Sequence, residues 1–139
     1  MFVLDTNVVS ELRRPEKADP RVLAWASATP LSMFFLSSIT VLELELGTLL
    51  MERKDPAQGA TLRAWMNNQV LPSFEGRILA IDLAVAQRCA RLHVPDPRAE
   101  RDALIAATAL VHGMTVATRN TVDFEPTEVQ IVDPWKDPS

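Results

Sequence analysis

Acidic residues at the ends of apolar segments are the side chains of this sequence best suited to chemistry. Asp5 directly follows the apolar run Phe2–Leu4, and Asp123 comes soon after a second run, Thr115–Ala117. Asp102 begins a segment that is apolar almost all round, where an unpaired carboxylate is either strongly destabilising or forced to take a proton. An acid in the first turn can also stabilise the helix dipole, but that role would suit an exposed position better than this apolar face. We therefore favour a functional role for Asp102.

The segment from Thr40 to Gly47 offers two further acids, Glu43 and Glu45. The spacing predicts a helix here, because leucines recur at intervals of three and four, at Leu42, Leu46, Leu49 and Leu50. The two glutamates flank opposite edges of that leucine face, so helical periodicity does not choose between them. Glu43 also has a structural interpretation, since Thr40-x-x-Glu43 matches a capping box at a helix start.

Structural interpretations exist for the other acids as well. Asp5 could cap a short helix over Val8–Leu12, and Asn120 with Asp123 could form a turn. Their joint placement is harder to explain in this way, because strand ends and the starts of the following helices meet at one edge of a parallel sheet. Carboxylates crowded at one edge repel each other unless a cation lies among them. With no His or Cys in these segments the donors are all oxygen, which selects Mg²⁺ or Mn²⁺ over zinc.

The elements that must position these acids alternate between strand and helix patterns. Short, continuous apolar runs predict buried strands at Phe2–Leu4, Met33–Leu36, Ile78–Ile81, Thr115–Ala117 and Val129–Val132. Helical patterns lie between them, at Pro20–Ala28, Thr40–Glu52, Pro56–Gln69, Leu83–Leu92 after an Asp82 cap, and Ala99–Val111 before Gly113. We therefore predict an α/β three-layer sandwich whose central, mainly parallel five-stranded sheet is flanked by helices. Ligands of such sheets bind outside the carboxyl ends of the strands.

Composition limits the function classes. The 139 residues are 47% hydrophobic and 23% charged, without repeats or linkers, so we expect one domain over residues 1–139. No apolar run is long enough to span a bilayer, the start has no basic signal region, and the single Cys89 cannot form an internal disulfide. We therefore expect a cytoplasmic protein with no membrane partner.

The net charge of −4 argues against a uniformly basic surface. Setting four carboxylates aside at a metal site, however, leaves the remaining acids equal in number to the 14 basic residues. Net acidity thus does not exclude a nucleic acid that is held locally, through bound cations and a few arginines.

Four motifs, taken in order, give the chain a resemblance to the PIN domain family. They are Leu4-Asp5-Thr6-Asn7-Val8-Val9-Ser10-Glu11-Leu12, Ser38-Ile39-Thr40-x-x-Glu43-Leu44-x-x-Gly47, Asp102-x-Leu104-Ile105-Ala106-Ala107-Thr108-Ala109-x-x-His112-Gly113 and Thr118-Arg119-Asn120-x-x-Asp123-Phe124. Each is weak alone, but together they extend over nearly the whole chain. The sequence is most similar to VapC-type toxins close to the FitB-like branch, whose chains also tend to end near a Pro-Trp pair such as Pro134-Trp135.

The resemblance implies a PIN-like fold and a Mg²⁺-dependent endoribonuclease, the toxic component of a type II toxin–antitoxin pair that a cognate antitoxin neutralises. It places the catalytic and metal-binding acids of the family on Asp5, Glu43, Asp102 and Asp123, and so prefers Glu43 to Glu45. Asp5 and Asp102 would be the principal ligands, and the other two would act through water, hold a second ion or orient the attacking water. Mn²⁺ would be a substitute ion, and RNA cleavage would leave a 5′-phosphate and a 3′-hydroxyl.

Further roles follow from the same resemblance. Thr6, Thr118 and Asn120 would hydrogen-bond around the acids. For an RNA phosphate contact we favour Arg119, ahead of Arg13, Arg14, Arg98 and Arg101. The protein would form a homodimer and a hetero-oligomer with its antitoxin, whose tail would lie over the acidic cleft.

Three function classes compete with a nuclease. A non-catalytic PIN-like adaptor for RNA or protein would have lost one or more of the acids, whereas all four are present. A small haloacid-dehalogenase-type phosphatase needs a second Asp two residues after the first, and Asn7 occupies that place. A response-regulator receiver would need paired acids near the first strand.

The remaining residues of chemical interest have ordinary structural interpretations. His93 and His112 lie at expected helix ends, where the C-terminal dipole favours histidine. We expect Cys89 to fill a small space in the core and Trp25 and Trp65 to pack against apolar neighbours.

Overall fold

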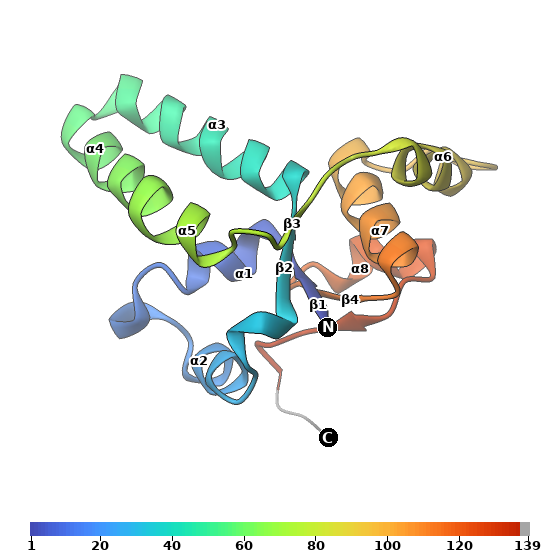
Figure 1. Cartoon of the computed structure of the whole chain (residues 1–139), viewed down its shortest axis with the longest axis horizontal. Helices are drawn as coiled ribbons and strands as arrows, with labels where there is room; N and C mark the ends of the chain where they lie inside the picture. Colours follow the sequence, from blue (N-terminus) through green and yellow to red (C-terminus); the bar gives the residue numbers. More distant parts are fainter. Residues whose placement is uncertain (137–139) are drawn as a thin grey trace.

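A five-stranded parallel sheet forms the centre of the computed structural model, which describes residues 1–136 (Figure 1). The strands are β1 (Phe2–Leu4), β2 (Phe34–Ser37), β3 (Ile78–Leu79), β4 (Thr115–Ala117) and β5 (Ile131–Val132). Their order across the sheet is β3-β2-β1-β4-β5, and every pairing is parallel. The predicted α/β sandwich is confirmed.

Helices connect the strands, as crossovers between parallel strands require. Their bounds are α1 (Thr6–Glu11), α2 (Pro20–Ser27), α3 (Ser38–Lys54), α4 (Pro56–Trp65), α5 (Leu71–Ser73), α6 (Leu83–Leu92), α7 (Glu100–His112) and α8 (Thr121–Phe124). Single 3₁₀ turns lie at Pro15–Lys17, Leu31–Met33 and Glu125–Thr127, and a π-helical segment, Met66–Val70, continues α4. Because Leu31–Met33 is a 3₁₀ turn, β2 begins one residue later than predicted.

Two helix starts show how local chemistry sets the boundaries. Asp82 caps α6 as predicted, because its carboxylate accepts a hydrogen bond of 3.0 Å from the Val85 N–H. The predicted Thr40–Glu43 capping box, by contrast, is wrong. Ser37 caps α3 by accepting from the Ile39 N–H at 3.1 Å, so Thr40 lies inside the helix and Glu43 is free for another partner.

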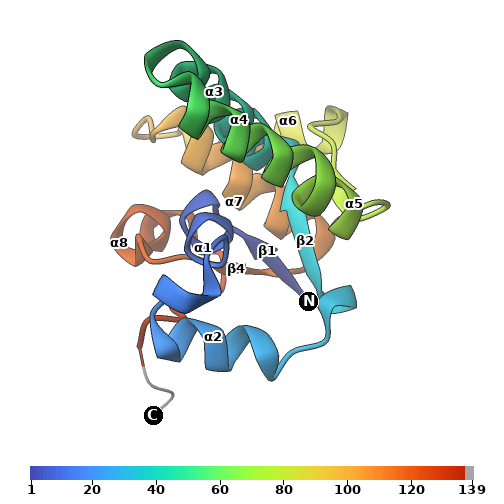
Figure 2. The same cartoon turned by 90° about the vertical axis from the view of Figure 1, so that its left-hand side faces the viewer.

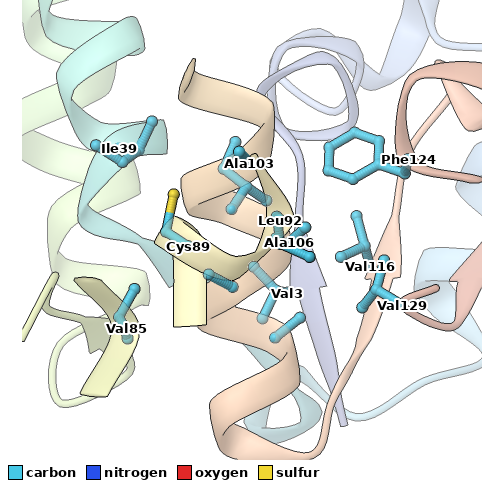
Figure 3. Packing of buried hydrophobic residues seen from close by; sticks show 13 residues of the cluster. Val3, Ile39, Val85, Cys89, Leu92, Ala103, Ala106, Val116, Phe124 and Val129 are labelled. Carbon is cyan, nitrogen blue, oxygen red and sulfur yellow. The ribbon is translucent and has the colours of Figure 1, made fainter. Parts of the chain in front are cut away.

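Alternating side chains of the central strands divide the core into two clusters, one on each face of the sheet. Val3 packs on the face that α6 and α7 cover, whereas the next residue, Leu4, packs on the face beneath α1 and α2. Figure 3 shows the first cluster, where Ala103 and Ala106 of α7 lie close to Val3. The figure also places Cys89 among these side chains, which confirms it as core.

The helix α3 turns a different face to the core than its leucine pattern suggests. Its buried residues are Ile39, Thr40, Leu44 and Thr48. The leucines that predicted the helix are exposed, namely Leu42, Leu46, Leu49 and Leu50. Figures 1 and 2 show α3 and α4 extending together beyond the sheet. Within residues 1–136, no helix is long and apolar enough to cross a membrane.

Candidate active site

The carboxylate of Asp5 lies at the carboxyl end of the central strand β1 and is 5% exposed. Its backbone N–H donates to the Ala117 carbonyl of β4 at 2.9 Å, so sheet pairing fixes its position. One oxygen, Oδ1, accepts from the Thr6 N–H at 2.8 Å and thereby caps α1. The other, Oδ2, accepts from the Thr118 hydroxyl at 2.8 Å. The capping interpretation and the functional one therefore apply to the same side chain.

Asn7 is a site residue that the sequence interpretation missed. Its amide nitrogen lies 3.3 Å from Asp5 Oδ2 and 3.4 Å from the Thr118 hydroxyl. Its amide oxygen accepts from the Arg119 N–H at 3.3 Å. Asn7 thus joins the end of β1 to the loop after β4. The Asp-x-Asn spacing was a usable signal, because an amide two residues after a capping aspartate stays within reach of it.

Glu43 reaches the same place from the first turns of α3. Its Oε1 accepts a hydrogen bond of 2.7 Å from the Thr6 hydroxyl, and its Oε2 lies 3.7 Å from the guanidinium of Arg101. Glu45 points elsewhere, because both of its oxygens accept from the Arg63 guanidinium of α4, at 2.7 and 2.9 Å. The structure therefore brings Glu43, and not Glu45, to Asp5.

Asp102 and Asp123 complete a group that we call the acid edge, consisting of Asp5, Glu43, Asp102 and Asp123. Asp102 lies half-buried in the first turn of α7, and Asp123 is exposed in α8. Burial, followed by the negative charges of Asp5, Asp123 and Glu43, raises the pKa of Asp102 to about 6. Because each of the other three acids acts on this carboxyl, the four side chains face one region of space.

The acid edge is under electrostatic strain that a cation would relieve. Burial also raises the pKa of Asp5, against hydrogen bonds from Thr118, Thr6 and Asn7 that lower it, and the Glu43 charge adds to the increase. No three acid-edge oxygens lie within 4.8 Å of one another, since the only such trio in residues 1–136 is elsewhere. Mg²⁺ typically binds one or two carboxylates directly and keeps several waters, so it does not require three close carboxylates, and the all-oxygen donors of the acid edge suit it.

The other predicted site residues lie around this group in different ways. Thr6 and Thr118 donate to acid-edge oxygens through their hydroxyls. Asn120 contributes its backbone, whose N–H donates to the Thr118 hydroxyl at 2.9 Å. The guanidinium of Arg119 lies over the ring of Trp135, 5.3 Å from its centroid. Of the arginines considered, Arg101 is the one paired with an acid-edge carboxylate.

A second group of side chains, whose ligating atoms do lie within 4.8 Å of one another, consists of Cys89, His93 and Glu100, which we call the α6–α7 corner. His93 Nε2 lies 3.8 Å from Cys89 Sγ and 3.3 Å from Glu100 Oε2. His93 Nδ1 accepts a hydrogen bond of 3.0 Å from the Arg98 N–H. In a neutral imidazole that acceptor role leaves the proton on Nε2, where a metal would have to bind.

A family comparison matches residues 2–127 of the chain to the PIN domain. Two curated relatives extend over nearly the same length. Toxin FitB of Neisseria gonorrhoeae is 40% identical over 143 residues, covering 99% of this chain and 100% of the relative. VapC ribonuclease Y4jK of Sinorhizobium fredii is 39% identical over 143 residues, covering 98% and 99%.

Solved structures share the fold. The crystal structure of FitAcB from Neisseria gonorrhoeae superposes with a TM-score of 0.88 at 39% identity, covering 97% of this chain and 99% of that one. A toxin–antitoxin complex from Klebsiella pneumoniae superposes with a TM-score of 0.69 at 27% identity, covering 99% and 100%. The similarity therefore includes the elements that carry the acid edge.

Proposed function

We propose that this chain, which belongs to the PIN domain family, is a divalent-metal-dependent endoribonuclease and the toxic member of a toxin–antitoxin pair. The observation that carries the proposal is the acid edge, where Thr6 joins Asp5 to Glu43 through its N–H and its hydroxyl, and Arg101 brings Glu43 beside the start of α7, next to Asp102. The relatives named as a VapC ribonuclease and as a toxin support the activity and the biological role.

In this proposal Asp5 and Asp102 hold a Mg²⁺ ion, with Mn²⁺ as a substitute. When bound, the ion supplies neutralising charge at the scissile phosphate and lowers the pKa of water. Thr118 and Asn7 donate to Asp5 Oδ2, and Thr6 donates its N–H to Oδ1, so the carboxylate keeps one orientation. Such outer contacts typically alter metal affinity or activity about 10- to 100-fold.

Glu43 and Asp123 act on the nucleophile. Water attacks phosphorus in line with the leaving 3′ oxygen, the P–O3′ bond breaks, and a carboxylate accepts the proton of the attacking water. The departing 3′ oxygen takes a proton from solvent water, which gives the 3′-hydroxyl. The Thr6 hydroxyl fixes one oxygen of Glu43, which leaves the other oxygen beside Arg101 and the opening of the site. Asp123 is exposed and therefore suited to act through water.

The partners proposed are RNA, a cognate antitoxin and a second copy of the chain. A similar fold is found in a toxin–antitoxin complex, which supports the antitoxin. The homodimer is supported by the exposed leucines of α3, which are 38 to 60% exposed at Leu42, Leu46, Leu49 and Leu50. Apolar stripes of this size on one helix face favour burial in an interface.

Cleavage of a mixed RNA pool by the purified protein tests the proposal. We expect cleavage with Mg²⁺ or Mn²⁺, none with EDTA, and recovery when the metal is restored. Glu43→Gln and Glu45→Gln form a matched pair on one helix, and only the first is expected to slow cleavage, because Glu45 is held by Arg63. RNA binding without cleavage would favour the adaptor, and hydrolysis of a simple phosphomonoester would favour the phosphatase.

A further inference from the structure

A cluster of basic side chains follows α1 and forms the opening of a small polar pocket. Arg13, Arg14 and Lys17 line this pocket together with Ser10 and Glu11. We call the three cations the basic turn. The Lys17 N–H donates to the Arg14 carbonyl at 2.9 Å, which closes the chain tightly and brings the residues of the turn together.

The segment of the basic turn has an excess of positive charge, because its three cations outnumber its two acids, Glu11 and Glu16. Within residues 1–136, no ion pair joins any of the three to a carboxylate. Glu11 lines the same pocket, and its carboxylate accepts a hydrogen bond from the Asp19 N–H at 2.7 Å instead of pairing with one of the cations. Arg13 lies over the ring of Trp65, 6.0 Å from its centroid, while Arg14 and Lys17 are exposed. Three cations thus remain available to an external anion, in a protein of net charge −4.

The basic turn is continuous with the acid edge along one face of α1. Thr6 and Asn7, which contact Asp5 and Glu43, are followed at helical spacing by the exposed Ser10, which lines the basic pocket. Residues three and four apart share a helix face. The six residues of α1 span about 9 Å at 1.5 Å per residue, so one short stretch of an extended RNA strand can reach both regions. Figure 2 shows α1 and the segment after it together on the near side of the molecule.

The inference rests on the proposed ribonuclease activity, which has an electrostatic difficulty that the basic turn would relieve. A cluster of carboxylates repels the phosphates that flank the scissile one, and a bound ion acts only locally. We propose that the basic turn binds backbone phosphates of the RNA strand that flank the phosphate at the acid edge. The helix dipole does not account for the cations, because α1 ends at Glu11 and the dipole effect falls off within the last turn.

The salt dependence of RNA binding tests this assignment without any cleavage. A labelled, mixed-sequence single-stranded RNA is titrated in EDTA with the parent, with R14A/K17A and with the control R53A/K54A. The control removes the same charge from two exposed residues at the far end of α3. For R14A/K17A we expect affinity to fall about tenfold near 0.1 M salt and the slope of log K against log salt to become shallower by about 1.4, since each phosphate contact contributes about 0.7.

Cleavage kinetics provide a second readout. For a long RNA, R14A/K17A should raise KM and leave kcat unchanged, and for a dinucleotide, which is too short to reach the basic turn, neither value should change. A salt slope equal to that of the parent overturns the inference, as does an equal loss in R53A/K54A. Unchanged RNA binding with weakened antitoxin binding would also overturn it, by assigning the turn to an acidic protein segment. If the parent binds RNA but cleaves none with metal, the proposed function fails while the salt slope still tests the basic turn.

Discussion

The acid edge and the α6–α7 corner both bring titratable side chains together from separate elements. They differ in whether groups of the same chain compensate the charges. At the corner, His93 Nδ1 accepts from the Arg98 N–H, and Nε2 faces Glu100. Burial, followed by the Glu100 charge, raises the pKa of the Cys89 thiol and keeps it neutral. The corner therefore resolves its own electrostatics with groups of this chain.

The acid edge does not compensate its own negative charges in this way. Its hydrogen-bond donors fix the orientation of Asp5 and Glu43, but four carboxylates still face one region and the pKa of Asp102 is raised to about 6. The corner has the tighter set of ligating atoms, yet the edge has the stronger need for a cation. Unrelieved like charge held in a fixed geometry thus indicates function better than closeness of ligating atoms alone.

Two acids in the first turn of α7 give the largest expected contrast between these regions. Asp102→Asn should reduce RNA cleavage by at least about 1000-fold, because it removes a carboxylate that we propose as a principal metal ligand. Glu100→Gln, two residues earlier in the corner, should leave the cleavage rate unchanged. Steady-state cleavage rates in Mg²⁺, with circular dichroism to check folding, measure both. Equal rates in Asp102→Asn and the parent would remove Asp102 from the site.

The Thr118 hydroxyl, which donates to Asp5, is expected to have an effect of intermediate size. Thr118 lowers the pKa of Asp5 by donating to Oδ2, so Thr118→Val should raise that pKa. The acidic limb of the cleavage rate should then move to higher pH, with a loss of about 10- to 100-fold at neutral pH. Thr115→Val, in the strand β4 that precedes Thr118, serves as the control. A uniform loss at every pH would indicate a packing effect instead.

Metal-free stability should depend on pH through Asp102. Its pKa is raised from 3.8 to about 6 in the folded protein, so the folded state binds this proton more tightly than the unfolded state. The destabilisation is present in full above about pH 6 and fades as the pH falls toward about 4.

In EDTA, Tm should therefore contain a contribution that rises on acidification through this window, and Asp102→Asn should remove that contribution and raise Tm at neutral pH by a few degrees. Mg²⁺ should stabilise the parent more than Asp102→Asn. Parallel Tm profiles for the two proteins would show that Asp102 carries no such penalty.

The smallest effect is expected at the corner itself. His93→Asn removes the contact with the Arg98 N–H and should cost about 1 kcal/mol in the free energy of unfolding. Cleavage should stay within about twofold of the parent, because no residue of the corner contacts the acid edge. Zn²⁺ titrations followed by Tm should show no stabilisation that His93→Asn abolishes. A Zn²⁺ effect dependent on His93 would make the corner a metal site after all.

Local sequence patterns determined most of the fold. Apolar runs located all five strands within a few residues, and cap residues such as Asp82 located helix starts, because burial periodicity and first-turn hydrogen bonds are properties of short segments. The same reasoning placed Asp5 and Asp102 at one edge of the sheet, since parallel strands end on the same side.

Only the tertiary structure separated Glu43 from Glu45 by physical contact. Both flank the leucine face of one helix, and the difference arises from α4, whose Arg63 engages Glu45, and from α1, whose Thr6 engages Glu43. The exposed leucines of α3 and the contacts of Asn7 with Thr118 have the same origin. A helix or strand pattern fixes which residues share a face, but the elements packed against that face decide what each side chain meets.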